Sequence, residues 1–217
     1  MGTCIILDNI KDYCSKKTSS YHHGNLKEEL LNQSVDIISK DGIDALTLSV
    51  LSKKLGTSRS AIYRHFSSKD ELMENVILYV FEILESKIES VFILKDKDIL
   101  EKFYLMGKEY INFAIKYPNL YRMLFGNKFQ TIRQDNCAIE NEEQSTGFYT
   151  LVNLLKEGQE KKIFKNDDPI FQAQVIHSMV HGLSSLYIDG HSHIKDNIDE
   201  LYESTYKTLT YGLSLDN

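Results

Sequence analysis

Residues 46–69, with the sequence LTLSVLSKKLGTSRSAIYRHFSSK, contain no aspartate or glutamate, although the chain carries 31 acidic residues in its 217. The same window holds several basic side chains: Lys53, Lys54, Arg59, Arg64, His65 and Lys69. A basic, acid-free stretch inside an acidic chain creates a local positive surface, and such a surface favours contact with a polyanion.

The apolar residues of this window predict two short helices. The first segment, which Thr47 is placed to cap, ends at Gly56 and directs three side chains into the core: Leu48, Leu51 and Leu55. The second segment begins after Ser58, a favourable N-cap residue, and directs three side chains inward: Ala61, Ile62 and Phe66. Two short helices joined by a tight glycine-containing turn form a helix-turn-helix, whose second helix can enter the major groove of DNA.

The charge of the chain is divided unequally. Residues 1–72 contain ten Lys and Arg against nine Asp and Glu, whereas the remainder contains fifteen against twenty-two, for a total of −6. This distribution predicts a DNA-facing head on an acidic body that is repelled by phosphate.

The head is predicted to begin after a flexible arm over residues 1–20. Asn25 and Glu28 have the spacing of a capping box and open a first helix that Gly42 closes. Ser68 and Glu71 repeat that spacing and open a long helix over residues 69–91. We therefore expect a helix-turn-helix domain over residues 21–68 and a second domain over residues 69–217, with the long helix as the connection.

The second domain is also predicted to be helical, which makes the fold class all-α. Its apolar residues lack the alternation of strands, and turn signals fall at helical intervals. Asp168 followed by Pro169 is a strong helix start. Helices are expected over residues 99–116, 142–161, 169–188 and 198–213, with a loop over residues 127–141.

The segments YHHGNLKEELL and TLSVLSKKLGTSRSAIYRHFSSKDEL resemble the N-terminal domain of the TetR family of transcriptional regulators, over residues 21–72. Farther along, YPNLYRMLFG and VHGLSSLYIDG resemble a subgroup with a Trp-His-Gly-like motif, although Val180 stands at the tryptophan position. The resemblance implies an all-α homodimer with two DNA-binding heads and a body that binds a small-molecule effector. It also implies dimerisation through the last two helices and a palindromic operator in double-stranded DNA.

Base contacts are expected from Arg59, Ser60 and Arg64, because an arginine near the start of a recognition helix can donate two hydrogen bonds to guanine. The alternative for one or both arginines is contact with phosphate alone, or no role beyond making the surface soluble. Tyr63 and His65 resemble the phosphate-contacting pair of the family. Thr47, Ser58 and Lys69, at helix starts, complete the expected DNA-binding set. Lys53 and Lys54 are equally well explained as a solvated helix face.

The second domain is rich in aromatic residues, most of which must form its core. In the resembling family some of them line an apolar effector pocket with a few polar groups. The residues proposed for it here are Phe103, Tyr110, Phe113, Tyr117, Tyr121, Phe148, His177 and His181. The two histidines share a helix face, yet a third metal ligand is missing, so packing or an interface hydrogen bond is the preferred interpretation. We expect no metal and no cofactor.

The leading hypothesis is a ligand-responsive repressor that functions in the cytoplasm without an enzymatic activity. No apolar run approaches the length of a membrane span, and Cys4, Cys14 and Cys137 are expected to be free thiols. One alternative is a DNA-binding protein of the same fold that acts architecturally or through protein partners, without small-molecule control. Another is a helical binding protein or enzyme whose head has lost affinity for DNA.

Overall fold

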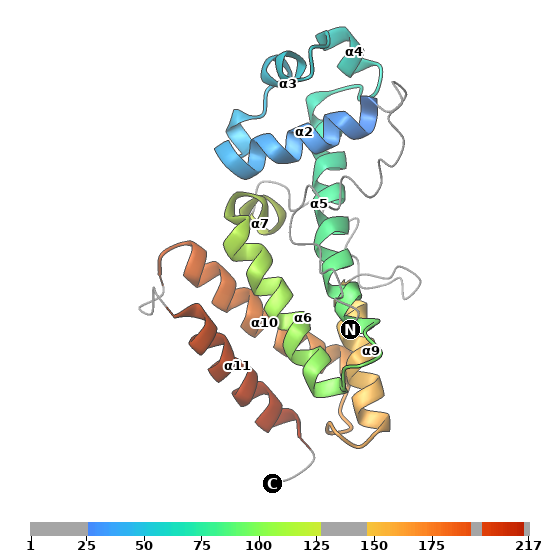
Figure 1. Ribbon diagram of the computed structural model, residues 1–217, viewed down its shortest axis with the longest axis vertical. Helices are drawn as coiled ribbons and strands as arrows, with labels where there is room; N and C mark the ends of the chain where they lie inside the picture. The colour runs from blue at the N-terminus through green and yellow to red at the C-terminus, as the bar shows by residue number, and fades with distance from the viewer. Residues whose placement is uncertain (1–25, 127–146, 192–196, 215–217) are drawn as a thin grey trace. The chain divides into compact units, whose positions relative to one another are not determined.

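The computed structural model describes residues 26–126, 147–191 and 197–214 (Figure 1). In these residues the fold is all-α, as predicted, and the extended backbone is limited to a single bridge between Phe164 and Ser214. The predicted arm, the residue Asn25, the loop over residues 127–141 and the three cysteines lie outside the described residues. No helix among the described residues is long and apolar enough to cross a membrane.

The chain forms two compact units. The first unit takes residues up to Ile83 together with the segment from Tyr117, and the second takes the rest. Because α5 (Lys69–Phe92) is a single helix, its first part belongs to one unit and its last part to the other. The predicted boundary between residues 68 and 69 separates a DNA-binding domain from an effector-binding domain, and this functional division stays a prediction.

The first unit begins with α2 (Leu26–Asp41), followed by a 3-10 turn, η1 (Ile43–Ala45). The helix-turn-helix consists of α3 (Leu48–Lys54) and α4 (Arg59–Tyr63). Gly42 and Gly56 have φ angles of 82° and 60°, in the left-handed region where only glycine is free of strain. Both glycines therefore permit the abrupt turns that end α2 and α3.

Buried apolar side chains hold the helix-turn-helix on α2. Leu30, Ile38, Leu51, Ile62 and Phe66 are each exposed by 1% or less. Leu55, which was expected in the core, is instead half-buried at the end of α3. Its position at the turn, where the backbone leaves the helix, places it at the margin of the core.

The start of α5 confirms only part of the predicted capping box. The Glu71 backbone N–H donates to the Ser68 hydroxyl oxygen at 3.0 Å, as expected for an N-cap. The Glu71 carboxylate, however, accepts from the backbone N–H of Ser67 at 2.5 Å and also from the Ser67 hydroxyl. The side chain therefore reaches one residue farther back than the standard box places it.

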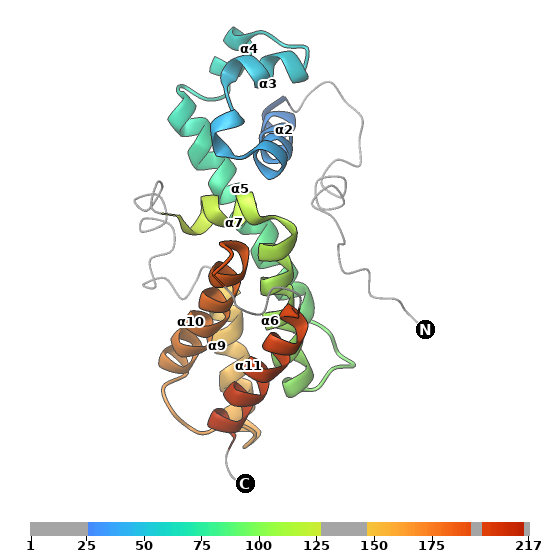
Figure 2. The ribbon, with the colours of Figure 1, turned by 90° about the vertical axis from the view of Figure 1, so that its left-hand side faces the viewer.

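The second unit contains α6 (Ile99–Lys116), α9 (Gly147–Glu160), α10 (Pro169–Ile188) and α11 (Ile198–Leu213). Figure 2 shows α10 beside α9 and α6. The predicted bounds of α6, α10 and α11 are confirmed, and α9 is described from Gly147 onward. As expected, the Asp168 carboxylate caps α10 by accepting from the N–H groups of Ile170 and Phe171 at 2.8 and 3.2 Å.

Tyrosines attach α11 to α6. Tyr202 donates its hydroxyl to the backbone oxygen of Tyr104, and Tyr206 donates to that of Leu100 at 3.2 Å. Tyr104 in turn donates to the Glu203 carboxylate at 2.5 Å. Gly107 makes room for this arrangement, because a Cβ atom there would lie 2.5 Å from the Tyr202 hydroxyl. The two helices are thus joined by long side chains.

Candidate DNA-binding surface

The helix-turn-helix separates into a buried face and an exposed polar face. Ile62 and Phe66 are each 1% exposed, whereas Tyr63 is 51% exposed. The other residues expected to contact DNA are also exposed: Thr47, Ser58, Arg59, Ser60, Arg64, His65 and Lys69. Packing of the two apolar side chains therefore leaves the polar side of α4 exposed to solvent.

Hydroxyl groups fix the starts of both helices. Thr47 Oγ1 accepts from the backbone N–H of Val50 at 3.2 Å, and Ser58 Oγ accepts from that of Ala61 at 3.1 Å. Ser58 Oγ also lies 2.8 Å from Ser60 Oγ, within hydrogen-bond distance. Ser58 thus caps α4 and orients the neighbouring hydroxyl of Ser60, one of the expected base-contacting residues.

The α4 helix is short, and a turn extends it. After Tyr63 the backbone N–H groups of His65 and Phe66 both donate to the Ile62 oxygen, at 2.9 and 3.1 Å. Arg64 keeps helical angles, with φ of −73° and ψ of −22°. Arg64 therefore continues the exposed face that Arg59 begins.

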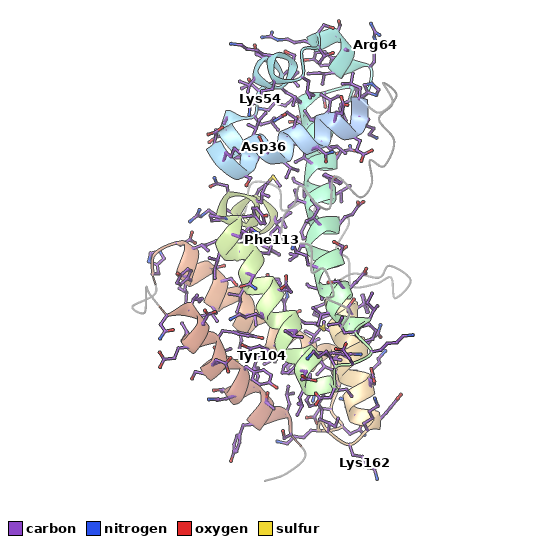
Figure 3. The ribbon with its side chains drawn as sticks, viewed as in Figure 1. Asp36, Lys54, Arg64, Tyr104, Phe113 and Lys162 are labelled. Atoms are coloured by element: carbon purple, nitrogen blue, oxygen red, sulfur yellow. The ribbon has the colours of Figure 1, made fainter. Side chains whose placement is uncertain are left out.

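Asp36 on α2 forms an ion pair with one of the basic side chains of the helix-turn-helix. Its carboxylate lies 2.7 Å from Lys40 Nζ. It also lies 3.6 Å from the Nζ of Lys54, which is labelled with Asp36 in Figure 3. Burial acts to raise the pKa of Asp36, but the hydrogen bond and charge of Lys40, together with the charge of Lys54, outweigh it and lower the pKa. Of Lys53 and Lys54, which the sequence left open between DNA contact and a solvated helix face, Lys54 therefore forms an ion pair within the protein.

Among the described residues, three basic side chains of the expected DNA-binding set form no ion pair: Arg59, Arg64 and Lys69. Lys69 shares the first turn of α5 with Asp70 and Glu71. Their negative charges stabilise the N-terminal end of the helix, and they also reduce the attraction of this helix end for an anion. The expected phosphate contact of Lys69 therefore stays a prediction.

A further basic residue, Lys27 on α2, lies near this region. Its Nζ is 5.5 Å from the centre of the Phe66 ring. Hydrogen bonds from Ser67 are the main reason why the pKa of Glu71 is lowered, and the charge of Lys27 adds to that effect. The sequence did not predict that Lys27 lies beside the helix-turn-helix, because no local pattern relates it to Phe66 or Glu71, about 40 residues farther along the chain.

The residues expected to line an effector pocket fall into both units. Tyr117 and Tyr121 belong to the first unit, where Tyr121 is 1% exposed and its ring centre lies 4.7 Å from that of Phe125. The rest lie in the second unit, in which Phe103 and Phe113 are buried. A shared pocket for all eight residues stays a prediction.

Four of these residues converge in the second unit: Tyr110, Phe148, His177 and His181. The Tyr110 hydroxyl lies 3.3 Å from His177 Nε2 and 3.1 Å from His181 Nδ1. The ring of Phe148 packs edge-on against His177, with ring centres 6.3 Å apart. Burial, together with the charge of His181, lowers the pKa of His177 to about 4. His177 is therefore neutral near pH 7.

This convergence does not form a recognisable metal site. Within the described parts of the chain, no three His, Cys, Asp or Glu side chains are grouped so that they could hold a metal ion. A phenol between two imidazoles is instead a hydrogen-bonding group, in which Tyr110 can donate to one ring nitrogen and accept from the other.

Comparison with known proteins gives matches to both parts of the chain. The profile of bacterial regulatory proteins of the tetR family matches residues 27–76. The profile of a tetracyclin repressor-like C-terminal domain matches residues 103–209. The matched C-terminal profile does not test the resemblance to the Trp-His-Gly subgroup, which stays a prediction.

A similar curated protein is the nucleoid occlusion factor SlmA of Vibrio cholerae serotype O1. It is 32% identical over 158 residues, which make up 70% of this chain and 79% of the relative. The corresponding factor of Vibrio vulnificus strain YJ016 is 33% identical over the same length and with the same coverage.

Solved structures share the fold. A protein of unknown function from Rhodococcus sp. RHA1 superposes with a TM-score of 0.74 at 23% identity, covering 90% of this chain and 99% of that one. A TetR-family regulator from Haemophilus influenzae gives 0.64 at 18% identity, with 88% and 97% covered. Together with the two profiles and the exposed helix-turn-helix, these similarities establish that the chain belongs to the TetR family of DNA-binding transcriptional regulators.

Proposed function

We propose that the protein is a dimeric repressor that binds a palindromic operator and leaves it when a small-molecule effector binds to the second unit. The observation that carries the DNA-binding part is the acid-free, exposed face of α3 and α4 opposite the buried side chains of Ile62 and Phe66. In a helix-turn-helix, such a face on the second helix lies in the major groove.

On this face we assign two kinds of contact. Arg59 and Arg64 have the donors to read guanine, and the Ser60 hydroxyl is positioned beside them by Ser58. The remaining residues surround that centre and are assigned to phosphates: Thr47, Tyr63, His65 and Lys69. Phosphate contacts fix the register of the protein on DNA, whereas base contacts select the sequence.

Dimerisation is supported by an apolar stripe on α10. Phe171, Val175, Met179 and Leu186 are 72, 46, 36 and 53% exposed, and their spacing places them along one side of the helix. Exposed apolar side chains at helical spacing mark a surface that another helix covers. A second copy of the same stripe, related by a two-fold axis, would cover it and place two heads on a palindrome.

Release by an effector is supported by the convergence of Tyr110, Phe148, His177 and His181. Ligand sites of proteins combine aromatic walls with a few convergent polar groups, which this cluster offers. An effector that binds better to a dimer with the wrong head spacing shifts the population away from the DNA-binding form. The ring of Phe103 packs instead against those of Phe164 and Tyr206. The pocket roles of Phe103, Phe113, Tyr117 and Tyr121 stay predictions.

A second candidate is favoured by the name of the Vibrio relatives. Those proteins are called nucleoid occlusion factors, a name that does not mention control by a small molecule. The same head on this chain would then bind chromosomal sites while the second unit contacts a protein partner. The two candidates share DNA binding and differ in what the second unit recognises.

Selection of bound fragments from genomic DNA tests the shared part. We expect wild-type protein to enrich fragments with a palindromic sequence, and Arg59→Ala to lose that preference while retaining non-specific binding. Lys156→Ala, an exposed lysine of α9, is the matched control and should enrich the same fragments. Equal enrichment of random and genomic DNA by the wild type would contradict the proposal.

The enriched operator then separates the two candidates. A metabolite library that releases operator DNA from the wild type, but not from a His181→Phe variant, would support effector control. A library without effect would favour the second candidate. Dimerisation is tested by sedimentation, in which Phe171→Glu should shift the protein to monomer and Asn153→Glu, on the exposed side of α9, should not.

A further inference from the structure

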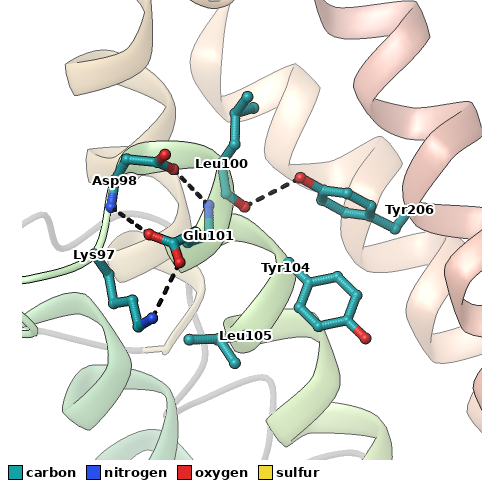
Figure 4. A pocket seen from close by; sticks show the side chains of 7 residues that line it. All are labelled: Lys97, Asp98, Leu100, Glu101, Tyr104, Leu105 and Tyr206. Atoms are coloured by element: carbon teal, nitrogen blue, oxygen red, sulfur yellow. Dashed lines mark hydrogen bonds and ion pairs between the residues drawn. The ribbon is translucent and has the colours of Figure 1, made fainter.

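We propose that an open depression between α6 and α11 binds a small organic cation with primary or quaternary ammonium groups. The depression has a volume of about 280 Å³ and lies within the second unit. Figure 4 shows the side chains that border it, among them Lys97, Asp98, Glu101, Tyr104 and Tyr206. It is distinct from the cluster of Tyr110, His177 and His181.

Two aromatic rings form one side of the depression. The rings of Tyr104 on α6 and Tyr206 on α11 have centres 5.1 Å apart and are nearly perpendicular, at 85°. The faces of aromatic rings carry partial negative charge, so they attract ammonium groups, and the attraction is strongest for cations whose hydration is weak. Aromatic walls are therefore suited to an alkylammonium ligand.

Carboxylates add negative potential to these walls. Asp98 and Glu101 border the depression directly, and Glu203 accepts the hydroxyl hydrogen of Tyr104. This hydrogen bond, with burial and the charge of Glu203, raises the pKa of Tyr104 to about 12. For Tyr206, burial is the main reason for a raised pKa, and the charges of Asp98 and Glu203 add to it. Both phenols thus lie in a negative field.

An ammonium group of the protein, that of Lys97, borders this depression. Lys97 Nζ lies 3.0 Å from Glu101 Oε1 (Figure 4). The hydrogen bond and charge of Glu101, followed by the charges of Asp96 and Asp98, raise the pKa of Lys97. The side chains of Lys97 and Glu101 are 35 and 47% exposed, so the pair is weak and a free ammonium group can replace that of Lys97.

The volume limits the size of the ligand. Pockets for drug-sized molecules generally have about 300 to 1,000 Å³, so this depression suits a smaller molecule. An occupant would contact residues of both helices, next to the hydrogen bond from Tyr206 to the Leu100 oxygen.

The test uses the full-length protein without DNA, so its outcome is independent of operator binding. Hexane-1,6-diamine is titrated by calorimetry and compared with hexane-1,6-diol, which has the same length and no charge. We expect binding of the diamine only. Glu101→Gln should weaken the affinity for the diamine about fivefold, while its amide oxygen can still accept from the Asp98 N–H. Tyr206→Leu should weaken this affinity similarly. Tyr206→Phe should retain most of the affinity.

Removal of the internal ammonium is the most specific test. Lys97→Ala should bind the diamine more tightly than the wild type, by up to about fivefold, because an exposed ion pair no longer has to be broken. Lys95→Ala, a lysine outside the depression, should leave the affinity unchanged, as should Glu160→Gln on α9. Unchanged or weaker binding by Lys97→Ala, or equal loss with Glu160→Gln, would overturn the proposal.

Discussion

Asn119 donates a hydrogen bond from its side-chain amide to the backbone oxygen of Ser39, at 3.1 Å and across 80 residues of chain. Ser39 lies in α2, the helix that supports the helix-turn-helix, and Asn119 lies in α7 (Pro118–Phe125). Both residues lie within the first unit, where α7 packs against α2. The bond therefore ties α7 to the helix that supports the DNA-binding head.

Replacement of Asn119 by alanine should therefore destabilise the first unit. A part-buried hydrogen bond is lost and the Ser39 oxygen is left without that partner, so the free energy of unfolding should fall by about 1 kcal/mol. Chemical denaturation measures the difference. Asn112→Ala, at an exposed position of α6, should change stability by less than about 0.5 kcal/mol. A similar loss in both variants would show that the hydrogen bond is not responsible.

Ser58 allows helix capping to be separated from DNA contact. Ser58→Ala removes the acceptor for the Ala61 N–H and should lower stability by about 1 kcal/mol. Ser58→Asp keeps a capping oxygen, so stability should remain near that of the wild type, but its charge should repel the DNA backbone. Thermal unfolding and operator titration together check both expectations. Equal stability of the alanine variant and the wild type would contradict the capping role.

The proposed phosphate contacts predict a change in salt dependence. Lys69→Ala should weaken binding to all DNA sequences and reduce the slope of log affinity against log salt concentration by about 0.9. Tyr63→Phe removes a neutral donor, so it should lower affinity while the slope stays the same. Titrations at several salt concentrations distinguish the two. A slope unchanged by Lys69→Ala would place Lys69 away from the phosphates.

Close packing at Gly158 predicts a steric effect in the second unit. A Cβ atom at this position of α9 would lie 2.2 Å from Phe164 Cδ2, and Phe164 is fully buried. Gly158→Ala should therefore lower the free energy of unfolding by about 1 to 3 kcal/mol, despite the better helix propensity of alanine. Gly212→Ala, where a Cβ atom meets nothing within 4 Å, should not destabilise the isolated chain. Equal effects at the two glycines would refute the steric explanation.

The lowered pKa of His177 predicts sensitivity to acid. The folded pKa of about 4 lies below the ordinary value of 6.5, so the unfolded chain binds more protons between these values. The free energy of unfolding should therefore be highest above pH 6.5, where His177 is neutral in both states. It should fall by at most about 3 kcal/mol as the pH decreases towards 4. His177→Gln should flatten this dependence in denaturation measured from pH 7 to 4. His191→Gln, at an exposed position, should retain the wild-type dependence.

Much of the fold could be predicted from local signals. Asp168 and Pro169 mark the start of α10, and the acceptor side chains of Thr47 and Ser58 mark the starts of α3 and α4. Each signal acts over three or four residues, through one hydrogen bond or one restricted dihedral angle. The exception was Glu71, which reached Ser67 instead of Ser68, because a flexible side chain has more than one donor nearby.

The candidate sites depended more on tertiary contacts. The pairing of Lys54 with Asp36, the convergence of Tyr110 with His177 and His181, and the joining of Tyr206 to Leu100 involve residues 18 to 106 positions apart. Residue type alone placed Tyr110, His177 and His181 in the effector set, but it did not indicate that the phenol would lie between the two imidazoles. It also did not indicate that α6 and α11 would form a depression with two tyrosine rings.

By itself, the sequence determined the helical class, the starts of several helices and the face of the helix-turn-helix that is exposed, because periodicity and capping are properties of neighbouring residues. Only the tertiary structure decided which side chains meet across helices, such as Asn119 with Ser39 and Tyr104 with Tyr206. Those contacts depend on the packing of whole helices, and packing is set by the combined shape of many side chains that no short segment contains.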